Sequence, residues 1–96
     1  MILNIEKALE LYKMLKDFIP EYELTDSYLD FAGKIIHNIN NSETPERFGE
    51  SIILMTGISV KELSETKSVD VIRLFIDGLS ENKFLSLLDF CKGLKI

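Results

Sequence analysis

Apolar residues recur every three or four positions from the start of the chain, which is the spacing of one face of an α-helix. The first run predicts a helix over residues 4–18, capped by Asn4 and stopped before Pro20. A second run predicts a helix over residues 26–40, in which the mid-helix Gly33 indicates close packing against another helix. Three residues are open as the cap of this second helix: Thr25, Asp26 and Ser27.

Capping signals predict two further helices in the middle of the chain. The third opens at Thr44-Pro45-Glu46, which supplies a capping residue, a proline at the first helical position and an acid. Gly57 is well placed to end this helix in the left-handed conformation. Ser59 and Glu62 then have the spacing of a capping box, which predicts a short fourth helix over residues 60–65.

The last third of the chain predicts two very apolar helices joined by a polar turn over residues 78–82. The fifth helix covers residues 69–78 after the cap Ser68, and the sixth covers residues 81–92 after the cap Ser80. Both are apolar around more of their circumference than the stripe of about 100° that a helix needs to rest on a core. They therefore either form the centre of the bundle or keep part of their surface for another chain.

Together these elements predict an all-α fold: one domain over residues 1–96, a compact bundle of five to six short helices that ends in a helical hairpin. Four apolar residues of the last two helices lie off the tightest core stripe, and we expect part of their surface to be open for a partner or for a second copy. These candidate partner-binding residues are Leu74, Ile76, Leu85 and Phe90.

The charge of the chain bears on what it binds. Its net charge of −5 speaks against a nucleic-acid partner, because phosphate contacts need clustered Lys and Arg. Five acids and no Lys or Arg lie between Asp17 and Asp30. This stretch is open to two interpretations: a solvated loop and helix start, or an acidic surface for a basic partner.

The N-terminus predicts no targeting signal, because Glu6 and Lys7 interrupt the stretch where the apolar part of a signal peptide would lie. No uncharged apolar run approaches the roughly 18 residues of a membrane span. Cys91 is the single cysteine and cannot form an internal disulfide, which favours an intracellular setting. We therefore expect a cytoplasmic protein that binds no membrane.

Catalysis needs several reactive side chains in one place, and here they occur only singly. His37 has no second His and no Cys near it in the sequence, so we expect a surface or boundary histidine and no metal ligand. Cys91 lies among leucine and phenylalanine residues, which is typical of a small buried hydrophobe. The five glycines are isolated from one another, which excludes a glycine-rich phosphate loop. We predict no enzyme, no catalytic residue, no cofactor and no metal.

A helix-turn-helix for DNA is the strongest competing pattern. Residues 59–63, a turn and residues 68–73 have its outline, and residues 68–79 would be the recognition helix. That helix offers Asp70, Arg73 and Asp77 among aliphatic residues. Reading base edges and phosphates needs more donors than one arginine, so we do not expect DNA binding.

Three stretches carry a resemblance to a known family: MTGISVKEL at Met55–Leu63, LFIDGLSENK at Leu74–Lys83 and LDF at Leu88–Phe90. IPEY at residues 19–22 and LDF at residues 29–31 extend it more weakly. In these motifs the chain resembles the tail assembly chaperones of long-tailed bacteriophages, small acidic helical proteins encoded near the tape measure protein. The likeness in individual motifs covers roughly the last 40 residues, and the rest of the chain shares only a helical pattern.

The resemblance implies a non-enzymatic function in the cytoplasm of a bacterial host. Proteins of this family coat apolar segments of the tape measure protein and help to recruit tail-tube subunits. The partners implied here are therefore the tape measure protein, the tail-tube protein and a second copy of the chain. The alternative is a small helical adaptor, or a structural or regulatory protein of the phage head–tail region.

Overall fold

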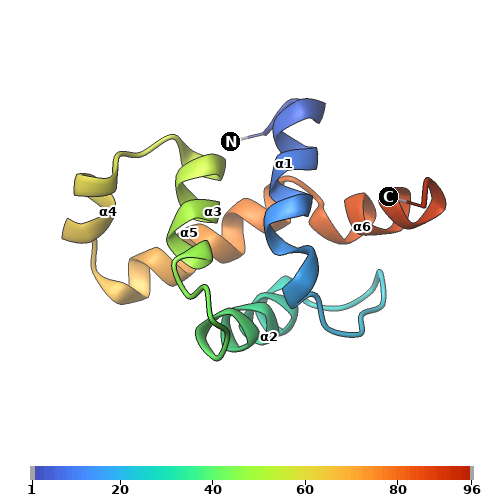
Figure 1. The fold of residues 1–96 in the computed structure, drawn as a ribbon, viewed down its shortest axis with the longest axis horizontal. Coiled ribbons are helices and arrows are strands. Elements are labelled where there is room, and N and C mark those ends of the chain that lie inside the picture. Colours follow the sequence, from blue (N-terminus) through green and yellow to red (C-terminus); the bar gives the residue numbers. More distant parts are fainter. Residues whose placement is uncertain (1, 96) are drawn as a thin grey trace.

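Residues 2–95, the part of the chain that this computed structural model describes, contain six α-helices and one short 3-10 helix (Figure 1). In chain order they are α1 (Ile5–Leu15), η1 (Lys16–Phe18), α2 (Tyr28–Asn40), α3 (Arg47–Thr56), α4 (Val60–Glu65), α5 (Ser68–Glu81) and α6 (Phe84–Gly93). No strand occurs within residues 2–95. The predicted all-α bundle is therefore confirmed.

The longest helix, α5, runs along much of the long dimension of a body that measures 39 × 27 × 25 Å (Figure 1). α1 and α3 pack against each other, and α2 and α3 both pack on α5. α4 lies at one end of the molecule and α6 at the other (Figure 1). The centre is thus covered from several sides.

Four of the predicted helix boundaries are confirmed in atomic detail. The side chains of Asn4, Ser27 and Ser59 each accept a hydrogen bond from the backbone N–H three residues further on, at 2.9, 3.1 and 3.1 Å respectively. Gly57 ends α3 with a φ of 75°, the left-handed conformation that glycine adopts without a steric cost. Of the three residues open as the cap of α2, Ser27 is the one that caps it.

Two other helix starts were predicted wrongly by a few residues. Pro45 and Glu46 form a turn in which the N–H of Arg47 bonds to the carbonyl of Thr44, and α3 begins only at Arg47. Ser68 is the first residue of α5 and not its cap, and Lys67 takes the cap position without a side-chain hydrogen bond. A serine or threonine thus marks the neighbourhood of each start without fixing the residue.

The junction between the last two helices also differs from the prediction. α5 continues through residues 78–81, so Ser80 lies inside a helix and does not cap α6. The chain turns at Asn82 and Lys83, and Lys83 has a φ of 49°. α6 then leads away from the end of α5 instead of folding back along it, so the two helices do not form the expected hairpin (Figure 1).

The glycine in this stretch serves packing and not a turn. A Cβ at position 78 would lie 2.7 Å from the Sδ of Met55, so Gly78 lets α3 and α5 approach closely. The opposite holds at Gly33, where a Cβ would meet no atom within 4 Å. The expected close packing at Gly33 is therefore wrong, and the close contact lies at Gly78.

Side chains from distant parts of the chain complete this junction. The hydroxyl of Tyr28 accepts a hydrogen bond from the backbone N–H of Leu85 at 3.0 Å, and so takes the place of a local cap at the start of α6. The side-chain oxygen of Asn82 accepts from the N–H of Leu3 at 2.7 Å. The end of α5 and the start of α6 are thus tied to α2 and to the N-terminal segment.

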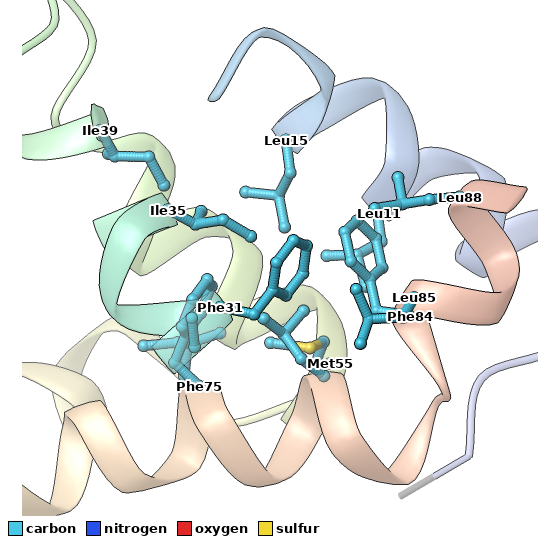
Figure 2. Close-up of a cluster of buried hydrophobic side chains, with 13 residues drawn as sticks. Leu11, Leu15, Phe31, Ile35, Ile39, Met55, Phe75, Phe84, Leu85 and Leu88 are labelled. Atoms are coloured by element: carbon cyan, nitrogen blue, oxygen red, sulfur yellow. The ribbon is translucent and has the colours of Figure 1, made fainter. Parts of the chain in front are cut away.

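The core surrounds Phe31, which lies at the centre of the cluster in Figure 2. Its ring centroid is 6.3 Å from that of Phe84, and a second aromatic pair, Phe48 and Phe75, lies 5.1 Å apart. The buried apolar residues come from every α-helix except α4. They are Leu11, Leu15, Phe31, Ala32, Ile35, Ile39, Ile52, Met55, Phe75, Leu79, Phe84, Leu85, Leu88 and Cys91.

Candidate protein-binding groove

The four residues predicted to face a partner do not form one surface. Phe90 is 53% exposed, but Leu85 is only 2% exposed because it packs in the core cluster, so the expectation that Leu85 is open is wrong. Leu74 and Ile76 are partly buried against the core. They are two positions apart on α5, which turns their side chains to different sides of the helix.

The structure instead opens an apolar hollow at the end of the molecule that α4 occupies. It has a volume of about 460 Å³ and is lined from α2, α3, α4 and α5. Its apolar lining consists of Ile36, Phe48, Leu63, Val71 and Ile72, with Gly49 between them. We call this hollow the α4 groove. Its volume lies within the roughly 300–1,000 Å³ of ligand sites in proteins.

The sequence builds the α4 groove through one short helix and one glycine. α4 is held by its capping box but supplies no buried residue to the core. A Cβ at Gly49 would lie 3.3 Å from the Cδ2 of Leu63, so α4 comes close to α3 at this point. The ring of Phe48 packs against that of Phe75 and thereby connects the groove to the core. The groove is therefore a gap that a six-residue helix leaves unfilled.

Exposed aliphatic side chains continue the groove onto the surface. Ile72, which lines it, is 41% exposed, and Val69, one turn earlier on α5, is 67% exposed. Val60 is 72% exposed and lies one turn before the lining residue Leu63 on α4. Scattered exposed aliphatics are ordinary, but a hollow bordered by several of them is typical of a protein-binding surface.

The chain segment that builds the α4 groove is acidic. Residues 36–72 contain six carboxylates and three Lys or Arg side chains, which gives this segment a formal charge of −3. All six carboxylates are exposed: Glu43, Glu46, Glu50, Glu62, Glu65 and Asp70. The surroundings of the groove therefore favour an occupant with basic residues beside its apolar ones.

The residues considered for chemistry lie apart from the α4 groove. Cys91 is fully buried in α6, as expected of a small hydrophobe, and this burial raises the pKa of its thiol. His37 is exposed on α2, as expected, with its Nδ1 3.4 Å from the side-chain nitrogen of Asn41. Residues 2–95 contain no group of three or more His, Cys, Asp or Glu that could share a metal ion. Within the same residues, no helix has both the length and the apolar character needed to cross a membrane.

Sequence reasoning missed the α4 groove. Ile36 and Phe48 lie at helical spacing with other apolar residues, and such a pattern by itself predicts the buried face of a helix. The available signal was the apolar excess at the start of α5, where Val69, Val71 and Ile72 leave few polar positions. What the sequence did not show is that the short helix α4 leaves these residues partly uncovered.

Comparison of the chain with protein-family models, with curated proteins and with solved structures gives no match. The function of the α4 groove must therefore be inferred from its own residues. Those residues offer apolar contact and partial exposure, and the chain segment that supplies them is acidic, which together are suited to binding another polypeptide.

Proposed function

We propose that this chain is a non-enzymatic binding protein that holds an apolar helical segment of another protein in the α4 groove. Following the resemblance in sequence, we propose a tail assembly chaperone of a long-tailed phage or prophage, acting in the host cytoplasm. Its partners would be the tape measure protein and the tail-tube protein. The observation that carries the proposal is the α4 groove with its exposed aliphatic border.

A helix docked in such a groove places apolar side chains at positions i, i+3, i+4 and i+7 into the hollow. Each large apolar side chain that leaves water contributes about 1.5–3 kcal/mol before the costs of association. A hollow of about 460 Å³ has room for only a few such side chains. The binding would therefore be moderate in strength, which suits a chaperone that must release its partner during assembly.

The acidic segment adds a preference among apolar helices. Exposed carboxylates such as Glu62, Glu65 and Asp70 attract a helix with Lys or Arg beside its apolar stripe and repel an acidic one. Charge of this kind acts mainly on the rate of encounter and on specificity. The proposed occupant is thus an amphipathic helix with a basic border, and we assign that role to a segment of the tape measure protein.

Co-expression with a tape measure protein tests this proposal. The wild-type chain is expected to raise the soluble fraction of the tape measure protein, and the variants Val69→Glu and Ile72→Glu are expected to lose this effect. The matched control is Leu29→Glu on α2, because Leu29 is 67% exposed like Val69 but lies outside the groove. Circular dichroism of each variant confirms that the fold is retained.

The proposal fails if the wild-type chain leaves the tape measure protein insoluble. It also fails if Leu29→Glu abolishes the effect as fully as the two groove variants do. Retained binding in all three variants would move the contact to another surface, of which Phe90 is the leading candidate from the sequence.

A further inference from the structure

A second hollow lies at the opposite end of the molecule and has a different chemical character. Its volume is about 400 Å³, and it is lined by residues of α1, η1, the loop that follows η1, α6 and the segment after α6. Three of its lining residues are lysines, Lys16, Lys92 and Lys95, and none is acidic. We call it the lysine pocket. In Figure 1, α6 and the loop after α1 lie at the end away from α4.

We propose that the lysine pocket binds a small organic phosphate, a phosphate monoester with an aromatic or other flat apolar body. The pocket gathers three of the eleven Lys and Arg residues of an acidic chain around one hollow. An anion in the pocket is attracted by the positive charge of all three side chains. Ammonium groups bind phosphate oxygens as point charges with short, charge-assisted hydrogen bonds.

The remaining walls of the lysine pocket fit the body of the ligand. Leu88 and Ile19 supply aliphatic surface, and Tyr12 and Tyr22 supply aromatic surface. The ring of Tyr22 is held edge-to-face against Phe31, with centroids 6.0 Å apart, so this wall is fixed by the core. A flat ring can therefore lie against Tyr22 while its phosphate reaches the lysines.

The hydroxyl group of Tyr22 is suited to donating a hydrogen bond to an anion. Burial raises the pKa of this phenol, and the nearby carboxylate of Asp89 raises it further. The hydroxyl therefore keeps its proton at neutral and moderately alkaline pH. Glu21 lines an adjoining hollow that shares Tyr22 and Lys92, so carboxylates lie near the pocket without lining it.

Titration of the ¹⁵N-labelled protein with phenyl phosphate, followed by NMR, tests this proposal. Saturable shifts are expected at the amides of Leu88 and Lys92, and inorganic phosphate is expected to bind the same amides more weakly because it lacks the ring. The variants Lys16→Gln and Lys92→Gln should each weaken the binding of phenyl phosphate about tenfold, since each removes one charge-assisted contact. Lys61→Gln, an exposed lysine of α4, is the matched control and should leave binding unchanged.

Several results would overturn the proposal. Shifts that do not saturate, or that weaken equally in Lys61→Gln, would mean diffuse attraction to surface charge. Phenol that binds as well as phenyl phosphate would mean that the lysines have no role. Inorganic phosphate that binds as well as phenyl phosphate would remove the aromatic part of the assignment. None of these results bears on the α4 groove, so the two proposals fail separately.

Discussion

The two halves of α5 have similar composition but different surroundings. In the first half, Val69 is 67% exposed and Ile72 is 41% exposed beside the short helix α4. In the second half, Phe75 and Leu79 have no exposed surface, because α2, α3 and α6 pack around them. Apolar content alone therefore does not decide burial. What decides it is how many residues of other helices reach each position.

This difference explains the exposed apolar surface at the start of α5. The sequence suggested spare apolar surface along both C-terminal helices, and exposed apolar residues occur both at the start of α5 and at Phe90 and Leu94, whereas Leu85 is buried. At the α6 end, α1 and the ring of Phe31 cover the inner face of the helix. At the α4 end, a helix of only six residues lies over the apolar side chains at the start of α5 and leaves them partly exposed.

The largest expected effect is the difference in stability loss when an apolar side chain is truncated in one half of α5 or in the other. Phe75→Ala should lower the free energy of unfolding by about 3–5 kcal/mol, because it leaves a cavity in the core. Ile72→Ala should cost less than about 1 kcal/mol, because its side chain is already partly in water. Urea unfolding followed by circular dichroism measures both. Equal losses in the two variants would mean that the start of α5 is as well packed as its end.

A smaller effect is expected at the start of α6. Tyr28→Phe removes the hydroxyl that accepts the backbone N–H of Leu85, and leaves that N–H partly buried without this partner. We expect a loss of about 1–3 kcal/mol in the free energy of unfolding. Amide hydrogen exchange at Leu85 should also become faster. If exchange there stays unchanged, the hydroxyl does not act as the cap of this helix.

The elements that could be predicted from the sequence are those encoded by neighbouring residues. Asn4, Ser27, Ser59 and Gly57 act within one turn of their own helix ends. Asn4, Ser59 and Gly57 were predicted correctly, and Ser27 was one of three candidates for its cap. The cap of α6 could not be read, because it comes from Tyr28, 57 residues earlier in the chain than Leu85.

Gly78 shows a second limit of sequence reading. Gly78 and Ser80 lie next to the polar residues 81–83, and this local pattern predicts a turn. In the structure, position 78 lies inside α5, and Met55 of α3 packs where a Cβ would be. The α4 groove was missed for a related reason. Its lining residues are apolar like those of the core, but no other helix covers them completely. Contacts between distant segments therefore decide both the conformation at Gly78 and the position of the groove.

The capping box of α4 allows the comparison to be tested without touching the core. Ser59→Ala removes the side chain that accepts from the N–H of Glu62, which should cost about 1 kcal/mol. Because α4 supplies no buried residue, we expect this loss to fall mainly on local opening. Amide exchange within residues 60–65 should become about fivefold faster while the urea midpoint changes little. The control Asn4→Ala removes a comparable cap from α1, which does supply core residues, and should shift the urea midpoint.

The smallest expected effect concerns the turn between α5 and α6, where Lys83 adopts a φ of 49°. This left-handed conformation is unfavourable for a residue with a Cβ and unstrained for glycine. Lys83→Gly should therefore raise the free energy of unfolding, by less than about 1 kcal/mol because glycine also gains freedom in the unfolded chain. Thermal unfolding measures the change, with Lys61→Gly in α4 as a control that should be neutral or destabilising. A loss of stability in Lys83→Gly would mean that the lysine side chain makes a contact at this junction worth more than the backbone strain it carries.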